Sequence, residues 1–175
     1  MKRFQLGQLK WLYLSFIIIG LDQLSKYIAV NNLNPYEPVP FFRGFNWMLA
    51  YNRGAAFSFL DSAGGWQQWV FNGIAFIVSL VLIRWMAMMK TQEKWLAIAC
   101  SFIIGGAIGN VIDRLIQAKV TDFIDWYYGQ YHWPTFNIAD SFIFLGAALF
   151  IFDTWIHPQQ PQDNKIDEVN DEKIG

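Results

Sequence analysis

The sequence predicts an all-α polytopic membrane protein with four transmembrane helices, and with a small β-sheet and a short interfacial helix in its first outer loop. The chain of 175 residues is 54% hydrophobic and 18% aromatic but only 15% charged, which is too apolar for an ordinary soluble domain. Four stretches supply the roughly 20 mostly apolar residues that cross a hydrocarbon core of about 30 Å. Each also carries a tryptophan near at least one end, as membrane interfaces favour. These stretches are residues 11–30, 66–89, 95–115 and 138–157.

The first stretch is interpreted as a retained span rather than a cleaved signal peptide. It is long for a signal-peptide core, no small-residue cleavage site follows it, and Asp22 and Lys26 interrupt its outer half. These two residues are four apart and share a helix face, so a local ion pair with Lys26 extending to the headgroups is the simplest structural explanation. The alternative is a functional role, because a charge at the centre of a span costs roughly 2.5 to 3.5 kcal/mol on insertion scales.

The first outer loop, residues 31–65, carries the predicted sheet. Breakers at residues 34–40 precede an aromatic stretch, Phe41 to Asn52, which predicts two short strands around Arg43-Gly44. We expect this sheet to lie on the membrane surface, with its aromatic residues from Phe41 to Tyr51 offering apolar area for acyl chains or forming a lid. Residues 55–60 predict the short interfacial helix.

Positive charges near the span ends predict the orientation. Lysines and arginines cluster before the first span and in the turn between the second and third, so both termini and that turn are predicted to be cytoplasmic. The opposite side also holds positive charges, several of them within the polar clusters described below, where a site can account for them. The whole of residues 1–157 is predicted to form one membrane domain, and the polar tail 158–175 a disordered cytoplasmic segment.

The third span turns a polar stripe toward the protein interior. Gly106, Asn110, Asp113 and Gln117 fall on one helix face, with Arg114 one turn beyond Asn110. The structural explanation is a buried network in which Asp113 and Arg114 pair with other helices, and we favour that role for these two. The polarity of the stripe nevertheless exceeds what helix packing requires.

Carboxylates also flank the fourth span. Alternation over residues 119–125 predicts a short extended stretch with Asp122 in it, and Asp140 falls in the first turn of the following helix, where a carboxylate commonly caps the N-terminus. Taken together at one membrane level, these aspartates indicate a two-carboxylate site. Two carboxyl groups about 3 Å apart share one proton and can hydrolyse a peptide without a covalent intermediate. The residues alone leave Asp122, Asp125 and Asp113 open as the partner of Asp140.

Other classes of function lack support in the sequence. A net charge of −1 provides no basic field for nucleic acid. Cys100 is the single cysteine, and His132 and His157 are far apart without ligand spacing, so neither a metal nor another cofactor is expected. No Ser-His or Cys-His arrangement is evident. A small proton-coupled transporter that uses the intramembrane carboxylates is the alternative function.

Five strings occur in order at a familiar spacing: Asp-Gln-Leu-Ser-Lys from Asp22, Asn-Arg-Gly-Ala-Ala-Phe-Ser from Asn52, Gly-Asn-Val-Ile-Asp-Arg from Gly109, Val-Thr-Asp-Phe-Ile from Val120, and Phe-Asn-Ile-Ala-Asp from Phe136. Together, from about Trp11 to about His157, they resemble the bacterial lipoprotein signal peptidase, also called signal peptidase II. The resemblance implies an inner-membrane aspartyl protease with its site near the periplasmic face. Its substrates would be prolipoproteins, cut before a cysteine that already carries a diacylglyceryl group, and membrane lipid would surround it.

The resemblance also implies which residues act. Asp122 and Asp140 match the catalytic aspartates of the family. The matching residues that shape or support the site are Asp22, Asn52, Gly54, Asn110, Asp113, Arg114, Asn137 and Ala139. We add Lys26 and Gly106 to this set because of their place in the polar clusters.

Overall fold

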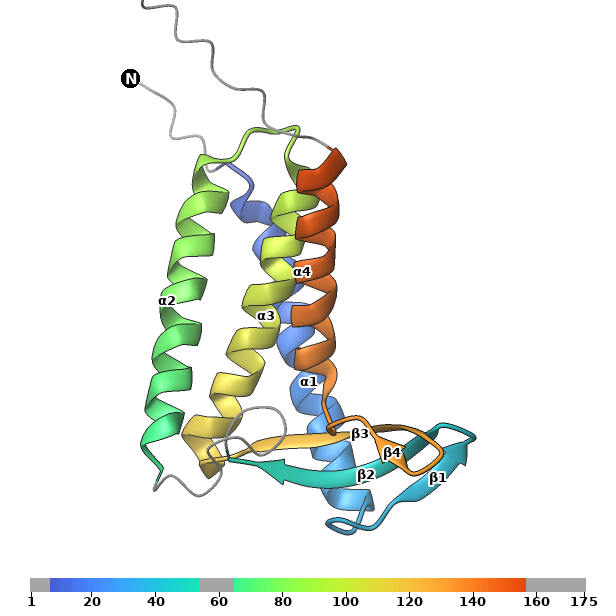
Figure 1. Ribbon diagram of the computed structural model, residues 1–175. Coiled ribbons are helices and arrows are strands. Elements are labelled where there is room, and N and C mark those ends of the chain that lie inside the picture. Colours follow the sequence, from blue (N-terminus) through green and yellow to red (C-terminus); the bar gives the residue numbers. More distant parts are fainter. Residues whose placement is uncertain (1–6, 54–64, 157–175) are drawn as a thin grey trace, which may run out of the picture.

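The computed structural model describes residues 7–53 and 65–156. In these residues a bundle of helices stands over a small sheet that lies across one end of it (Figure 1). The 3-10 turn η1 (Leu9–Trp11) leads into the first helix. The elements are α1 (Leu12–Asn32), β1 (Val39–Phe42), β2 (Phe45–Asn52), α2 (Trp66–Met88), α3 (Lys94–Gln117), β3 (Val120–Tyr128), β4 (Tyr131–His132) and α4 (Ile138–Ile156).

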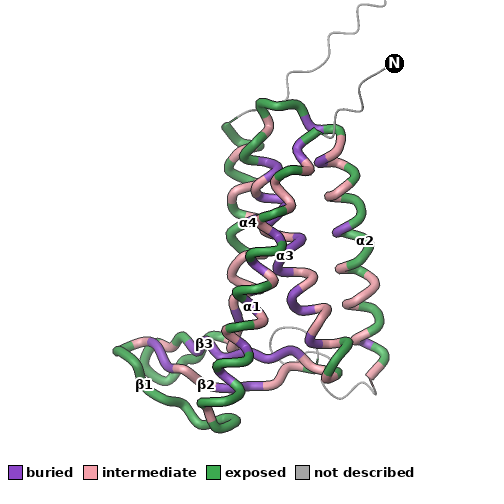
Figure 2. Tube along the Cα trace, turned by 180° about the vertical axis from the view of Figure 1, so that it is seen from behind, coloured by how far each residue is buried: buried purple, intermediate pink, exposed green. Residues whose placement is uncertain are grey.

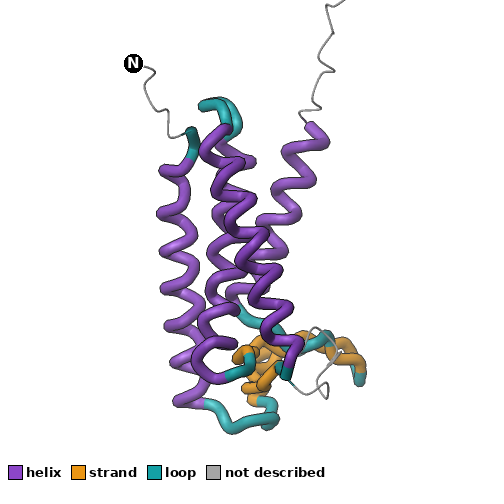
Figure 3. Tube along the Cα trace, turned by 90° about the vertical axis from the view of Figure 1, so that its left-hand side faces the viewer, coloured by secondary structure: helices purple, strands orange, loops and turns teal. Residues whose placement is uncertain are grey.

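The four apolar helices predicted from the sequence are present. Each is long and apolar enough to cross a membrane, with spans of Leu9–Asn32, Trp66–Met88, Lys94–Gln117 and Ile138–Ile156. Figure 3 shows all the strands gathered at one end of the bundle, and Figure 1 shows the start of α1 and the end of α4 at the other end. An even number of spans accounts for that arrangement.

Helix α3 is the centre of the bundle. It packs against α1, α2 and α4, and its sequence supplies small residues on the faces that meet them. Figure 2 shows the buried segments following α3 and continuing into the sheet. The other helices turn large apolar side chains outward, among them Phe16 and Trp69, each 75% exposed. That distribution suits helices whose outer surface faces lipid.

Glycines on α3 allow the closest approach of neighbouring helices. A Cβ added at Gly106 would collide with the backbone oxygen of Ala139 on α4, and one added at Gly109 would lie 2.6 Å from the Asp22 carboxylate of α1. Gly105 packs in the same way against Ile18, again on α1. The bundle therefore brings the polar residues of three helices together where α3 has no side-chain bulk.

The sheet differs from the predicted one in its origin. Its order is β1-β2-β3-β4 with antiparallel pairing throughout, so β1 and β2 of the first outer loop continue into two strands from the segment between α3 and α4. The extended stretch containing Asp122 was predicted, but its pairing with β2 was not, because pairing between segments some 70 residues apart leaves no local pattern. The first six residues of β3 are buried, so both faces of this part of the strand are covered by the protein.

Of the aromatic residues expected to offer an apolar surface, Phe41 and Phe42 are 66% and 60% exposed, whereas Phe45 is covered by the protein. Phe45 is 8% exposed and belongs to a cluster with Ala29, Phe123 and Ile124. Trp47 packs edge-on against Phe45, with ring centroids 4.7 Å apart. The expected interfacial helix at residues 55–60, Gly54 and the tail 158–175 lie outside the described residues.

A stability test follows from the glycine packing. Gly106→Ala should lower the melting temperature of the purified protein, since overpacking a close contact typically costs about 1 to 3 kcal/mol and the obstacle here is backbone. Gly73→Ala on α2 is the matched control, because nothing lies within 4 Å of its added Cβ. Equal melting temperatures for the two variants would contradict the packing described.

Candidate active site

Three helices and one strand bring the predicted polar residues to the sheet end of the bundle. Asp22 and Lys26 come from α1, Asn110 and Asp113 from α3, Asp122 from β3, and Asn137 and Asp140 from the start of α4. Strand β3 follows α3 almost directly, and the turn is made at Ala118, whose φ of 58° ends the helix in the left-handed region. Asp122 is therefore held close to the end of the polar stripe of α3.

Asn137 links the two candidate catalytic aspartates. Its Nδ2 donates to Asp122 Oδ1 at 2.7 Å, while its Oδ1 accepts from the backbone N–H of Asp140 at 2.9 Å. The backbone N–H of Asn137 in turn donates to Asp140 Oδ2 at 3.2 Å. The last two bonds are the reciprocal pair of a capping box. The capping explanation for Asp140 therefore holds, and the same residue that completes the cap also contacts Asp122.

The second oxygen of Asp140 is held from α3. Asn110 Nδ2 donates to Asp140 Oδ1 at 2.7 Å, and Asn110 Oδ1 accepts from Lys26 Nζ at 3.0 Å. An ammonium group can only donate, so Lys26 requires the amide oxygen of Asn110 on its side. The amide nitrogen is then directed at Asp140. Lys26 thus sets the orientation of Asn110 without touching Asp140 in any recorded contact.

Lys26 is enclosed by carboxylates. Its Nζ lies 2.8 Å from Asp22 Oδ2 and 3.2 Å from Asp113 Oδ2, and the residue is 4% exposed. The expected ion pair with Asp22 is present, but the expectation that Lys26 extends to the headgroups was wrong. Two acidic partners and the Asn110 oxygen offer the ammonium more than the interface does, because together they replace its hydration inside the protein.

The same carboxylates fasten neighbouring segments. Asp22 Oδ1 accepts from the backbone N–H of Ala139 at 2.9 Å, which is in the first turn of α4. Asp113 Oδ2 accepts from the backbone N–H of Thr121 at 2.9 Å, which places the residue before Asp122. Asp22 and Asp113 are therefore structural supports, one for each segment that carries a candidate catalytic aspartate.

Gln23 also belongs to this network, although it was not predicted as a site residue. Its Nε2 lies within hydrogen-bonding distance of Asp22 Oδ2 at 3.2 Å, Asp113 Oδ1 at 3.0 Å and the backbone oxygen of Gly109 at 3.1 Å. A signal was available, since a glutamine inside an apolar span is itself costly unless its amide is bonded.

The surroundings of Asp122 favour the protonated form of its carboxyl. Its burial, at 2% exposed, raises the pKa of its carboxyl to about 8, and the nearby Asp140 carboxylate adds to the rise. Hydrogen bonds from Asn137 and Asn52 and the charge of Lys26 act in the opposite direction without cancelling it. At neutral pH the Asp122 carboxyl therefore carries its proton.

The two other acidic candidates have different partners. Asp125 pairs with His132, with Oδ1 to Nδ1 at 2.8 Å, and accepts from Asn46 Nδ2 at 2.7 Å. Asp113 is engaged by Lys26 and by the Thr121 backbone, as described above. Of the three aspartates considered as the partner of Asp140, Asp122 is the one that shares a hydrogen-bonding residue, Asn137, with it.

Arg114 lies beside the aspartates but is not paired as expected. Its guanidinium lies over the ring of Phe71 on α2, 5.5 Å from the centroid, and interacts electrostatically with Asp140, Asp122 and Asp113. Its Nε has no hydrogen-bond partner among residues 7–53 and 65–156, nor is an ion pair recorded for it there. Arg114 thus supplies positive potential to the site without fixing a carboxylate.

Comparisons with known proteins agree with these features. A family model described as signal peptidase (SPase) II matches residues 14–156. A lipoprotein signal peptidase of Alteromonas mediterranea is 47% identical over 153 residues, covering 87% of this chain and 84% of the relative. One from Aeromonas hydrophila is 49% identical over 150 residues, covering 83% and 87%. A solved bacterial membrane enzyme is similar with a TM-score of 0.74 and 25% identity, covering 90% of this chain and 94% of the other.

The network predicts the effect of removing one buried charge. Asp22→Asn keeps an oxygen that can accept from Ala139 but leaves Lys26 with Asp113 as its one carboxylate partner. Breaking a buried ion pair typically costs about 3 to 5 kcal/mol of unfolding free energy, so the melting temperature should fall clearly. The double variant Asp22→Asn with Lys26→Met, which removes both charges, should recover much of the loss. If the two substitutions lowered the melting temperature additively, the ion pair between Asp22 and Lys26 would be contradicted.

Proposed function

The chain belongs to the signal peptidase II family, and from this membership we propose that it is an aspartyl endopeptidase that removes the signal peptide from lipid-modified prolipoproteins, with Asp122 and Asp140 as the catalytic pair. The relatives with which it shares nearly half of its sequence are named lipoprotein signal peptidases. The observation that carries the assignment of the pair is the Asn137 side chain, which bonds both Asp122 and the first turn of Asp140's helix.

The different surroundings of the two carboxyl groups support different roles. Asp140 accepts from a side-chain amide and a backbone N–H at the N-terminus of α4, where the helix dipole favours negative charge. Asp122 lies on a strand, buried, with its proton retained at neutral pH. We assign Asp140 as the carboxylate base and Asp122 as the acid.

The reaction then proceeds in two steps. Asp140 takes a proton from a water molecule, whose oxygen bonds to the scissile carbonyl carbon while Asp122 gives its proton to the carbonyl oxygen. In the second step Asp140 returns its proton to the amide nitrogen and the C–N bond breaks. One hydroxyl of the intermediate gives a proton back to Asp122. Both carboxyls end as they began, and no covalent enzyme intermediate forms.

Lys26 contributes through Asn110. Because its ammonium fixes the orientation of the Asn110 amide, the hydrogen-bond donor that holds Asp140 Oδ1 stays in place throughout the cycle. The lysine's own charge remains one amide away from Asp140. That separation supports catalysis, since a direct ion pair would hold the base in its charged form and resist its protonation in the first step.

The position of the pair suits a substrate that stays in the bilayer. Positive charges lie at or near the helix ends away from the sheet, at Lys10, Arg84, Lys90 and Lys94. By the positive-inside rule they support an orientation with that end in the cytoplasm and the sheet at the periplasmic face. A signal helix and a diacylglyceryl-bearing cysteine both remain in the membrane. Their junction reaches the interface, which is where the pair lies.

A proton-coupled transporter fits the arrangement less well. The buried aspartates of the described residues, Asp22, Asp113, Asp122 and Asp125, all belong to the sheet end of the bundle. A relay needs ionisable groups at successive depths through the membrane. Over the described residues the buried carboxylates instead lie at one end of the bundle.

Neutral substitutions test the pair directly. Asp122→Asn and Asp140→Asn should each reduce cleavage of a lipid-modified precursor by at least roughly 10²- to 10⁴-fold, the usual contribution of an acid or base, while the melting temperature is kept. Asp125→Asn is the matched control on the same strand and should cleave at nearly the normal rate. Normal cleavage by either dyad variant, or equal loss in the control, would contradict the assignment.

The pH profile tests which aspartate is the acid. Asp122 holds its proton below its pKa of about 8 and loses it above, so kcat/KM should be sustained at neutral pH and fall about tenfold per unit as pH rises beyond 8. Measurement from pH 6 to 10, with the melting temperature recorded at each pH, separates titration from unfolding. A profile that stays level to pH 10 with the protein folded would show that Asp122 is not the acid.

A further inference from the structure

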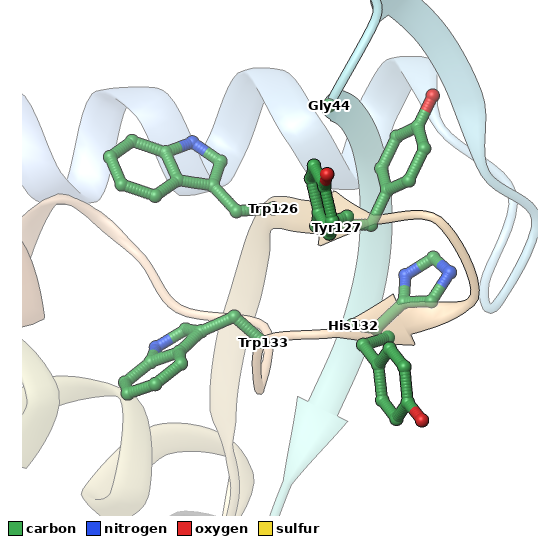
Figure 4. A pocket seen from close by; sticks show the side chains of 7 residues that line it. Gly44, Trp126, Tyr127, His132 and Trp133 are labelled. Carbon is green, nitrogen blue, oxygen red and sulfur yellow. The ribbon is translucent and has the colours of Figure 1, made fainter.

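We propose that the β3–β4 hairpin holds a binding site for the headgroup of a zwitterionic membrane phospholipid, separate from the aspartate pair. The site is a shallow hollow of about 380 Å³ walled by five aromatic side chains together with His132 and Gly44. Figure 4 shows Trp126 and Trp133 on one side of this region and His132 beside Tyr127 on the other. The proposal goes beyond the proposed function and does not depend on it.

The hollow is distinct from the catalytic site. Trp126 is four residues beyond Asp122 along β3, which is about 13 Å at the rise of a strand. Figure 1 shows the β3–β4 end of the sheet extending sideways from the bundle, away from the α3 end of β3. A molecule bound in the hollow would therefore leave the aspartate pair accessible.

His132 is held in a fixed orientation at the edge of the hollow. Its Nδ1 lies 2.8 Å from Oδ1 of Asp125, which is fully buried and also accepts from Asn46. The ring stacks on Tyr127 with centroids 5.3 Å apart and planes at 20°. Nε2 is then the ring nitrogen left over, and it has no hydrogen-bond partner among the described residues. Because the Asp125 carboxylate accepts from Nδ1–H, Nε2 is aimed outward, and in the doubly protonated ring it would donate to an anion such as phosphate.

The walls suit the other half of a zwitterionic headgroup. Tyr128 is 88% exposed, Tyr131 84%, Trp133 63% and Trp126 56%, so several aromatic faces are open in one small region. Aromatic faces attract an ammonium group through the negative charge of the ring face. Phosphate at His132 and ammonium against the rings together match phosphoethanolamine, whose two charges are a few bonds apart.

The position of the hairpin argues for lipid rather than another occupant. Exposed tryptophan and tyrosine are the residues that membrane interfaces favour, and this sheet extends sideways from the bundle at the level where the helices end (Figure 1). Arg43 is exposed in the β1–β2 turn next to Gly44, whose oxygen accepts from the Tyr127 backbone. The guanidinium of Arg43 therefore lies next to the hollow along the chain, and its positive charge would favour a phosphate there. The headgroup layer is continuous with the lipid that surrounds the helices.

Bound lipid would have a mechanical consequence. β3 carries Asp122 near its start and the hollow at its far end, so a headgroup held at the hairpin fixes the depth of the strand relative to the membrane surface. That depth sets how far Asp122 lies from the interface where a precursor is cut.

Native mass spectrometry of the delipidated full chain, titrated with phosphatidylethanolamine, tests the proposal. His132→Asn keeps a nitrogen for Asp125 in place of Nδ1 but removes Nε2, and the affinity for the first lipid should fall at least roughly tenfold, the loss of one charge-assisted hydrogen bond. Tyr131→Ala removes an exposed ring without disturbing the core and should also weaken binding. Trp95→Ala, a half-exposed residue at the opposite end of the bundle, is the control and should not.

A comparison of two lipids and a measurement of precursor cleavage distinguish a lipid site from a substrate site. Phosphatidylglycerol, which lacks the ammonium, should bind more weakly to the unmodified protein and be less affected by Tyr131→Ala. Equal affinity for the two lipids, or unchanged affinity in both hairpin variants, overturns the proposal. A rise in KM for precursor with lipid binding unchanged would assign the hollow to substrate instead and overturn it as well. The titration repeated on Asp140→Asn should give the normal affinity, so its result does not depend on the catalytic assignment.

Discussion

The carboxylate of Asp22 joins three helices at a single point, and the geometry of the site depends on it. One oxygen accepts the N–H of Ala139, a group in the first turn of α4 that has no partner within its own helix. The other oxygen pairs with Lys26. The carboxylate can reach both only because Gly109 on α3 presents no side chain in its path. Asp22 therefore fixes where α4 begins relative to α1, and the start of α4 is where Asp140 lies.

Neutral amides separate the charged supports from the proposed catalytic pair. Lys26 is surrounded by Asp22, Asp113 and the oxygen of Asn110, whereas the hydrogen bonds to Asp122 and Asp140 come from asparagine side chains and from a backbone N–H. In a low-dielectric interior an ammonium in direct contact would keep a carboxylate ionised through a catalytic cycle. Placing Asn110 and Asn137 between the fixed ion pairs and the two aspartates leaves a proton free to move between them, while their positions remain set by hydrogen bonds.

The sequence predicted the membrane helices and most members of the polar cluster because those features are local. Apolar length identifies a span, and a lysine or aspartate inside one is costly wherever it occurs. The assembly of the sheet was not predictable in that way, since β2 and β3 pair across the whole of α2 and α3. The predicted position of the Lys26 side chain at the headgroups was wrong for a related reason. Whether the Lys26 ammonium extends to the headgroups or stays buried depends on Asp113 and Asn110, which lie on another helix. Gly54 and residues 55–60 lie outside the described residues, so expectations for them stay predictions.

Two buried aspartates on one strand show how much their partners decide. Asp122 and Asp125 are three residues apart on β3, and an odd separation directs side chains to opposite faces of a strand. Asp125 lies 2.8 Å from His132 Nδ1 and accepts a hydrogen bond from Asn46 Nδ2. Asp122 lies near the Asp140 carboxylate and neutral amides. Its burial therefore raises the pKa of its carboxyl, which keeps a proton. The strand's own residues do not distinguish these outcomes. The segment that reaches each face does, and the N-terminus of α4, held by Asp22, brings Asp140 near Asp122, which is why we propose Asp122 as its catalytic partner.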